Sequence, residues 1–131
     1  MKLDHVAVAV SDAGAARRVF SDLLGLPVVH EETVEDQGVR VVSLSMGESK
    51  LELTEPLAPD SPVGRFISKR GQGLHHIALT VADLAGTLRR LETEGVQLID
   101  REPRVGAEGK LIAFLHPRST GGVLVELSQG V

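Results

Sequence analysis

Two histidines and two glutamates recur in this sequence at nearly matched distances. His5 precedes Glu52 by 47 residues, and His76 precedes Glu126 by 50 residues. Each glutamate stands among aliphatic residues, in a Leu-Glu-Leu and a Val-Glu-Leu segment. An ionised carboxylate in such surroundings is costly to bury unless it is paired or bound to a metal. Two imidazoles and two carboxylates would together form an N2O2 site for a divalent metal, with room for water or substrate.

The elements that must position these residues form two similar sets. In the first half, the apolar pattern predicts strands over 3–10, 28–34, 39–46 and 50–55, with a helix that begins after Ser11-Asp12. In the second half it predicts strands over 74–81, 96–99, 111–116 and 123–128, with a helix that Asp83 caps. The sequence therefore predicts an α+β fold in a single domain. It consists of two tandem βαβββ modules, 1–55 and 74–131, joined by a connector, 56–73, whose short helix begins at Ser61-Pro62.

A shift of 71 residues superimposes identical residues of the two halves. It pairs His5 with His76, Asp12 with Asp83, Leu3 with Leu74, Ala7 with Ala78, Val10 with Val81 and Arg18 with Arg89. A lone strand histidine or glutamate is more often structural or solvent-facing. Four such residues at duplicated positions favour a shared metal site. His30 and His75 have no counterpart, which favours structural or surface roles, and the role of His116 is left open.

Composition excludes several other classes of protein. The sequence has no cysteine, which excludes disulfides, thiolate nucleophiles and cysteine-ligated metals. Its formal net charge is -4 and no basic block interleaves with its three phenylalanines, so nucleic-acid binding is not expected. No apolar run approaches the ~18 residues of a membrane span. The first residues lack the pattern of a secretory signal, so a cytoplasmic location is expected.

Several segments resemble a known family over essentially the whole chain. They include Gly-Leu-His-His-Ile-Ala at 73–78 and His-Pro-Arg-Ser-Thr-Gly-Gly-Val-Leu-Val-Glu at 116–126. With the doubled module, they resemble the vicinal oxygen chelate superfamily, also called glyoxalase-like, and within it the methylmalonyl-CoA epimerase family. This resemblance implies a half-open barrel around a metal site. It also implies an isomerase of propionate metabolism that interconverts (R)- and (S)-methylmalonyl-CoA through a metal-stabilised enolate.

The resemblance also implies roles for individual residues. The metal ligands would be His5, Glu52, His76 and Glu126, the four residues that the repeat selects. Inversion of the substrate needs an acid/base group on each face of the enolate, and Glu126 is the first candidate. Some relatives place the second group, a glutamate, where this sequence has Val41. The second group therefore stays open between Glu52 and a metal-bound water.

The same resemblance indicates substrate contacts, a metal and partners. Lys110 would meet the substrate carboxylate or a CoA phosphate, and Gln37 is a second substrate-binding candidate. Glu108 departs from the histidine that many relatives carry in the Gly-Ala-His-Gly-Lys loop. Cobalt is the expected divalent metal ion, with nickel, manganese and zinc as alternatives. An acyl-CoA is the expected partner, with no nucleic acid and no membrane, and a homodimer is expected.

Two other functions use the same fold. A glyoxalase I-type lactoylglutathione lyase has a similar set of histidine and glutamate ligands, so the ligands do not distinguish it from an epimerase. A metal-free small-molecule-binding module would lack the ligands. An iron-dependent extradiol dioxygenase needs two histidines and one carboxylate, and the additional Glu52 argues against it.

Overall fold

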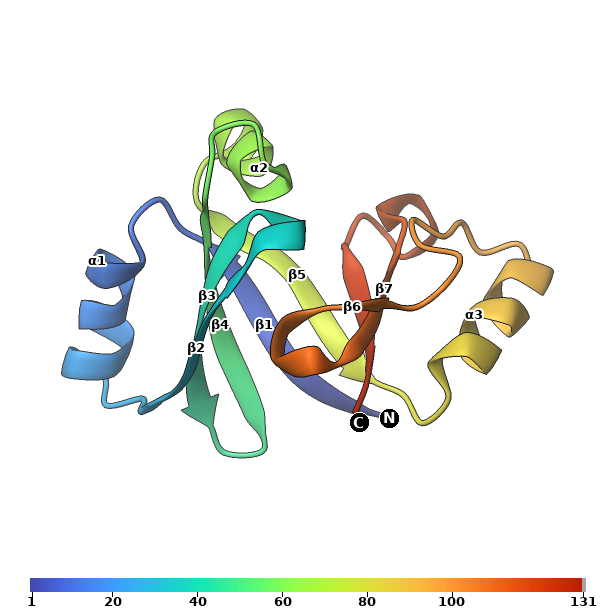
Figure 1. Ribbon diagram of the computed structural model, residues 1–131, viewed down its shortest axis with the longest axis horizontal. Helices are drawn as coiled ribbons and strands as arrows, with labels where there is room; N and C mark the ends of the chain where they lie inside the picture. The colour runs from blue at the N-terminus through green and yellow to red at the C-terminus, as the bar shows by residue number, and fades with distance from the viewer. Residues whose placement is uncertain (131) are drawn as a thin grey trace. The chain divides into compact units, whose positions relative to one another are not determined.

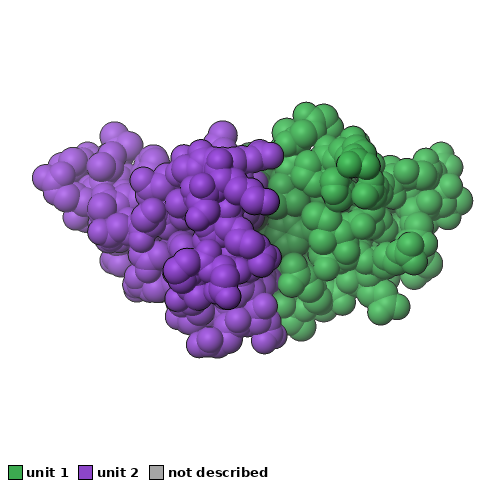
Figure 2. All heavy atoms as spheres, turned by 90° about the horizontal axis from the view of Figure 1, so that it is seen from above, with its two compact units in different colours: residues 1–4, 76–131 green, residues 5–75 purple. Residues whose placement is uncertain are grey.

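The computed structural model describes residues 1–130 and divides them into two compact units (Figures 1 and 2). One unit, called here the 5–75 unit, comprises His5–His75. The other, called the 76–130 unit, combines Met1–Asp4 with residues 76–130. No helix within residues 1–130 has both the length and the apolar character needed to cross a membrane.

The 5–75 unit is a four-stranded sheet covered on one face by a helix. Its elements are β1 (Lys2–Ala9, of which the first three residues belong to the other unit), α1 (Ala13–Arg17), a π-helix (Arg18–Leu23), β2 (Val28–Val34), a short 3-10 turn (Glu35–Gln37), β3 (Val39–Met46), β4 (Ser49–Pro56) and α2 (Pro62–Arg70). The strand order is β2-β3-β4-β1. β3 is antiparallel to both of its neighbours, whereas β1 is parallel to β4.

The helix starts predicted for this unit are confirmed. Asp12 caps α1 by accepting a hydrogen bond from the backbone N–H of Ala15, at 3.1 Å. Ser61 caps α2 by accepting from the N–H of Gly64, at 3.2 Å. These side-chain oxygens satisfy N–H groups that the first helical turn leaves without a partner.

Strand alternation gives the sheet of the 5–75 unit two different faces. One face packs under α1 in an apolar cluster of Val10, Ala13, Val42, Leu44, Leu51 and Leu53. The opposite face carries buried polar side chains, among them His5, Ser43 and Glu52. Successive side chains of a strand point to opposite faces, so the aliphatic neighbours of Glu52 form the core while Glu52 itself lies on the other side.

The 76–130 unit repeats this design. Its elements are β5 (Gly73–Thr80, of which the first three residues belong to the other unit), α3 (Leu84–Thr93), β6 (Arg104–Val105), a 3-10 turn (Ala107–Gly109), β7 (Leu111–Leu115), a second 3-10 turn (Pro117–Ser119) and β8 (Val125–Gln129). The strand order is β5-β8-β7-β6, with β5 parallel to β8 and β7 antiparallel to β8 and β6. The two sets of elements confirm the α+β class and the tandem βαβββ order.

The strand predicted over 96–99 is wrong. This stretch forms only a single bridge, between Leu98 and Leu115, and the edge strand is the later and shorter β6. Asp100 explains the difference, because its Oδ2 accepts a hydrogen bond from the N–H of Phe114 at 2.8 Å. A side chain thus occupies the edge of β7 where a continuing strand would pair.

Candidate metal centre

The first candidate pair, His5 and Glu52, comes from two adjacent strands of the 5–75 unit. Glu52 lies opposite Ala7 in the parallel pairing of β4 with β1. His5 is two residues before Ala7 and therefore points to the same face. The Nε2 atom of His5 lies 3.3 Å from Oε1 of Glu52, and each residue is 5% exposed.

Ser43 supports this pair from the next strand. It lies opposite Glu52 in the antiparallel pairing of β3 with β4, and it is fully buried. Its hydroxyl donates a hydrogen bond to Oε2 of Glu52 at 3.4 Å. The two carboxylate oxygens of Glu52 are therefore held from two sides, by an imidazole and by a hydroxyl. Such contacts offset the cost of burying the carboxylate.

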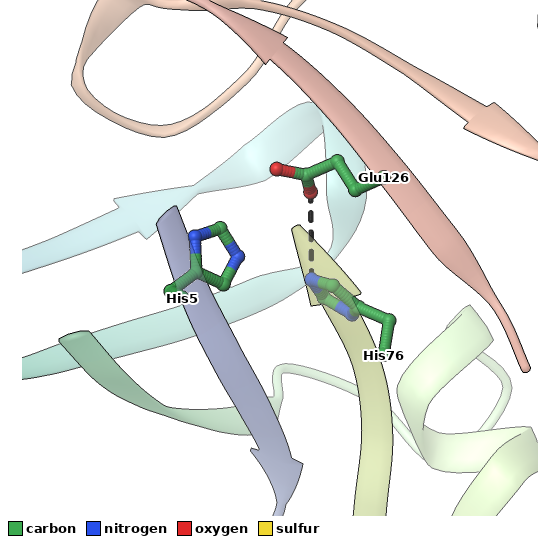
Figure 3. Close-up of side chains that lie close together, drawn as sticks. All are labelled: His5, His76 and Glu126. Carbon is green, nitrogen blue, oxygen red and sulfur yellow. Dashed lines mark ion pairs between the residues drawn. The ribbon is translucent and has the colours of Figure 1, made fainter. Parts of the chain in front are cut away.

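The second pair, His76 and Glu126, has the same construction in the 76–130 unit. Glu126 of β8 lies opposite Ala78 of β5, two residues after His76. The Nε2 atom of His76 lies 3.4 Å from Oε1 of Glu126, as the dashed line in Figure 3 shows. The two residues are 9% and 6% exposed. Equivalent register in both units thus produces equivalent histidine and glutamate pairs.

The surroundings of the second pair differ from those of the first. The position of Ser43 is taken by Phe114, which lies opposite Glu126 in the pairing of β7 with β8. The Phe114 ring meets the His76 imidazole edge to face, with 5.3 Å between the ring centroids. This contact fixes the orientation of the imidazole by packing, whereas Glu52 is oriented by the hydroxyl of Ser43.

The residue types of the two pairs fit a divalent metal. Imidazole nitrogen and carboxylate oxygen are ligands for Co, Ni, Mn and Zn, and each pair presents one of each from a buried position. The pairs are held by strands rather than loops, which keeps the donor atoms in place. The four residues selected by the sequence repeat are thus brought together two by two.

The predicted substrate-binding residues lie elsewhere on the two units. Lys110 follows the 3-10 turn before β7, and its Nζ lies 3.4 Å from Oδ1 of Asp4. Gln37 ends the 3-10 turn between β2 and β3. Its Nε2 atom is buried and makes no hydrogen bond within the described residues 1–130.

Two supporting residues, Ser43 and Phe114, were missed by reasoning from the sequence. Both lie inside predicted strands, but nothing in the sequence shows which residue of the neighbouring strand each one faces. The strand register supplies that information, because Ser43 and Phe114 are the direct partners of Glu52 and Glu126. Aligning the two modules strand by strand would have drawn attention to both positions.

The chain belongs to the Glyoxalase/Bleomycin resistance protein/Dioxygenase superfamily, whose family model matches residues 4–114. Among its relatives, the uncharacterized protein YqjC of Bacillus subtilis is 52% identical over 98% of this chain and 91% of that protein. The mitochondrial methylmalonyl-CoA epimerase of Bos taurus is 39% identical over 98% of this chain and 74% of its own. The ethylmalonyl-CoA/methylmalonyl-CoA epimerase of Cereibacter sphaeroides is 38% identical over 98% and 97%.

Solved structures place the chain in the same group. A hypothetical protein of Bacillus halodurans, BH1468, matches with a TM-score of 0.97 and 42% identity over 99% of this chain and 94% of that one. A variant of the Streptomyces coelicolor methylmalonyl-CoA epimerase, in complex with 2-nitronate-propionyl-CoA, matches with a TM-score of 0.96 and 37% identity over 100% and 95%. The expected glyoxalase-like fold and the resemblance to the epimerase family are both confirmed.

Proposed function

We propose that this protein is a metal-dependent methylmalonyl-CoA epimerase, an isomerase that inverts the carbon between the thioester and the free carboxylate. The observation that carries the proposal is the duplication of a buried histidine and glutamate pair in equivalent strand register. The likeness to epimerases over 98% of the chain supports it.

We propose that His5, Glu52, His76 and Glu126 bind one divalent metal ion, for which cobalt is the first candidate. Figure 3 draws three of these proposed ligands, His5, His76 and Glu126, whose residue types suit a metal ion. A Lewis-acidic ion at this centre would stabilise the negative charge that develops on the thioester oxygen when the α-proton leaves. The remaining steps depend on the protein's own side chains.

Glu126 is proposed to move a proton on one face of the substrate. Its carboxylate is buried, and Phe114 lies opposite it in the pairing of β7 with β8. A carboxylate so placed can accept the α-proton and return it. Glu52 was the other catalytic candidate, but His5 and Ser43 already hold both of its oxygens. We assign Glu52 primarily to the metal.

Lys110 and Gln37 are proposed to bind the acyl-CoA. The ammonium of Lys110 offers a positive charge to a carboxylate or phosphate, and it is partly exposed beside Asp4. The amide of Gln37 offers the buried donor described above. Both groups would hold the substrate without taking part in proton transfer.

We test this function by proton NMR of the metal-reconstituted protein in D2O. With (R)- or (S)-methylmalonyl-CoA, the α-proton signal should disappear rapidly in a metal-dependent way, and each epimer should give the other. His76→Ala should abolish the exchange, because it removes a metal ligand. Exchange no faster than a protein-free control, with cobalt, nickel, manganese or zinc present, would refute the proposal.

We further propose that the protein is a cytoplasmic homodimer. Oligomers of this kind are most often twofold symmetric. Light scattering after size-exclusion chromatography should give twice the 13.9 kDa of the chain. The mass of a single chain at micromolar concentration would contradict the dimer.

A further inference from the structure

A bulge in β2 redirects one histidine of the 5–75 unit. Val28 lies opposite Leu44, whereas His30 lies opposite Ser43, so the register shifts between them. In a regular strand Val28 and His30 would share a face. The bulge instead allows Val28 to pack in the apolar cluster with Leu44 while His30 lies on the face of Ser43. Bulges that re-aim a side chain are over-represented next to active sites.

Glu32 joins His30 on this face. It lies opposite Val41, which is two residues before Ser43 on β3 and therefore points the same way. Nε2 of His30 lies 2.9 Å from Oε1 of Glu32. The two side chains are 34% and 31% exposed, against 7% for each member of the His5 and Glu52 pair. A small molecule can thus reach Glu32.

Within the described residues, Glu32 and Glu52 are the two carboxylates that strand register places on this face of the 5–75 unit. The neighbouring Glu31 lies on the opposite face, where it pairs with Arg17 and Arg40. The side chain of Glu32 is 31% exposed and that of Glu52 is 7% exposed, so Glu32 is the more accessible of the two carboxylates on this face.

The position of Glu32 is not duplicated in the other unit. Its counterpart on the edge strand β6 is Arg104, which lies opposite Ile112 just as Glu32 lies opposite Val41. The guanidinium of Arg104 lies over the Phe114 ring, 5.6 Å from its centroid. The metal-ligand positions are therefore repeated, whereas the edge strands carry an acid in one unit and a cation in the other.

We propose that Glu32, positioned by His30, is the second acid/base residue of the epimerase, sharing proton transfer with Glu126; this rests on the proposed function. In one direction, the α C–H bond breaks, the proton passes to the Glu32 carboxylate and the electron pair enters the enolate. A proton from Glu126 then forms the new C–H bond on the other face. The reverse direction exchanges the two roles, and proton exchange of both carboxyl groups with water restores the enzyme for the next turnover.

The test compares Glu32→Gln with Glu31→Gln, its neighbour on the opposite face. In D2O, Glu32→Gln should lower the epimerisation rate by about 100-fold or more, the usual contribution of a general acid/base. The Glu32→Gln variant should still exchange the α-proton of the epimer that Glu126 deprotonates. This exchange should occur without inversion, because Glu126 acts on one face of the substrate only. Its metal content should equal that of the wild type. Glu31→Gln should epimerise as the wild type does.

His30→Asn tests the positioning role. We expect kcat to fall by roughly tenfold with KM nearly unchanged, since the proton-transfer group is misplaced while binding persists. His30→Asn should slow α-proton exchange of the same epimer whose exchange is lost in Glu32→Gln. A merely structural role would lower the exchange of both epimers equally.

The assignment is overturned if Glu32→Gln epimerises close to the wild-type rate, or if it loses exchange of both epimers equally with its metal intact. Glu32→Asp guards against a folding failure, because it keeps a carboxylate and should recover part of the rate. If the wild-type protein exchanges neither epimer, the proposed function fails, and this assignment fails with it. Failure of the assignment alone leaves wild-type exchange intact.

Discussion

The carboxylate of Glu126 lies 3.4 Å from the imidazole of His76, and both groups are buried. The same relationship holds between Glu52 and His5 at 3.3 Å in the other unit. Each pair partly satisfies its own carboxylate, so the donor atoms are held in position without a bound ion. A metal would then meet ligands that need little rearrangement, and binding would cost little conformational entropy.

Metal binding should therefore raise the thermal stability of the protein. A ligand that binds only the folded state at 100 times its Kd adds about 2.7 kcal/mol to the free energy of unfolding. Addition of Co²⁺ to the metal-free protein should accordingly raise Tm by several degrees, measured by differential scanning fluorimetry. His76→Ala should lose most of this rise, because it removes one proposed ligand.

His75→Ala is the matched control for this experiment. His75 precedes His76 in β5, and its ring packs edge to face against Phe66 at 4.8 Å between centroids. Its replacement changes Tm through lost packing, but the rise caused by Co²⁺ should remain. An equal rise in His76→Ala and the wild type would show that His76 is not a ligand.

Lys110→Gln tests the proposed contact with the acyl-CoA. Hydrogen bonds to charged groups are worth about 1.5–3 kcal/mol, so KM should rise by roughly 10- to 150-fold. kcat should change little, because the lost contact holds the substrate equally in the ground and transition states. Steady-state kinetics will separate the two constants. Lys69→Gln, in the last turn of α2, is the control and should leave both unchanged.

The positions of β2 and β3 could be predicted to the residue. Runs rich in valine over 28–34 and 39–46 mark both strands, and both have the predicted bounds. The bulge after Val28 could not be predicted. The run Val-Val-His-Glu-Glu contains no glycine or proline, and the bulge is visible only once Leu44 and Ser43 are known to be the partners of Val28 and His30.

The repeat predicted the two pairs of candidate ligands but not what lies around them. His5, Glu52, His76 and Glu126 are identifiable because the duplication preserves their types and spacing. Their partners are not duplicated, since Ser43 occupies the position that Phe114 takes in the other unit. The edge strand was also missed, because after the bridge at Leu98 the side chain of Asp100, in place of a backbone carbonyl, accepts the N–H of Phe114. The strand register and the hydrogen bond made by the Asp100 side chain are therefore the features that could not be predicted from the sequence.

The core under α1 should be sensitive to loss of volume. Leu44 is fully buried in the apolar cluster of the 5–75 unit. Leu44→Ala should lower the free energy of unfolding by about 2–5 kcal/mol, as large-to-small changes in cores do. Urea denaturation followed by circular dichroism will measure it. Leu23→Ala is the control, because Leu23 is 62% exposed and such substitutions stay within about 0.5 kcal/mol. Equal effects would contradict the described packing.

Gly64 in α2 and Gly14 in α1 should respond to alanine in opposite ways. A Cβ on Gly64 would lie 2.5 Å from the carbonyl oxygens of Ala58 and Pro59. Because these are backbone atoms, the helix start must shift, which should cost about 1–3 kcal/mol. A Cβ on Gly14 would meet only the side-chain Oδ1 of Asp12, at 3.2 Å. That oxygen, which also accepts the N-cap hydrogen bond from Ala15, belongs to a side chain and need shift only slightly, and alanine is favoured over glycine in helices by up to ~1 kcal/mol.

Urea denaturation of the two variants should therefore show Gly64→Ala destabilised and Gly14→Ala unchanged or slightly stabilised. The Gly64→Ala substitution should also disturb the N-cap of α2, since the N–H of Gly64 donates to Oγ of Ser61 at 3.2 Å. Ser61→Ala removes that cap without adding a Cβ near Pro59, and it should cost about 1 kcal/mol. If Gly64→Ala costs no more than Ser61→Ala, the close approach of the connector to α2 contributes nothing beyond the cap.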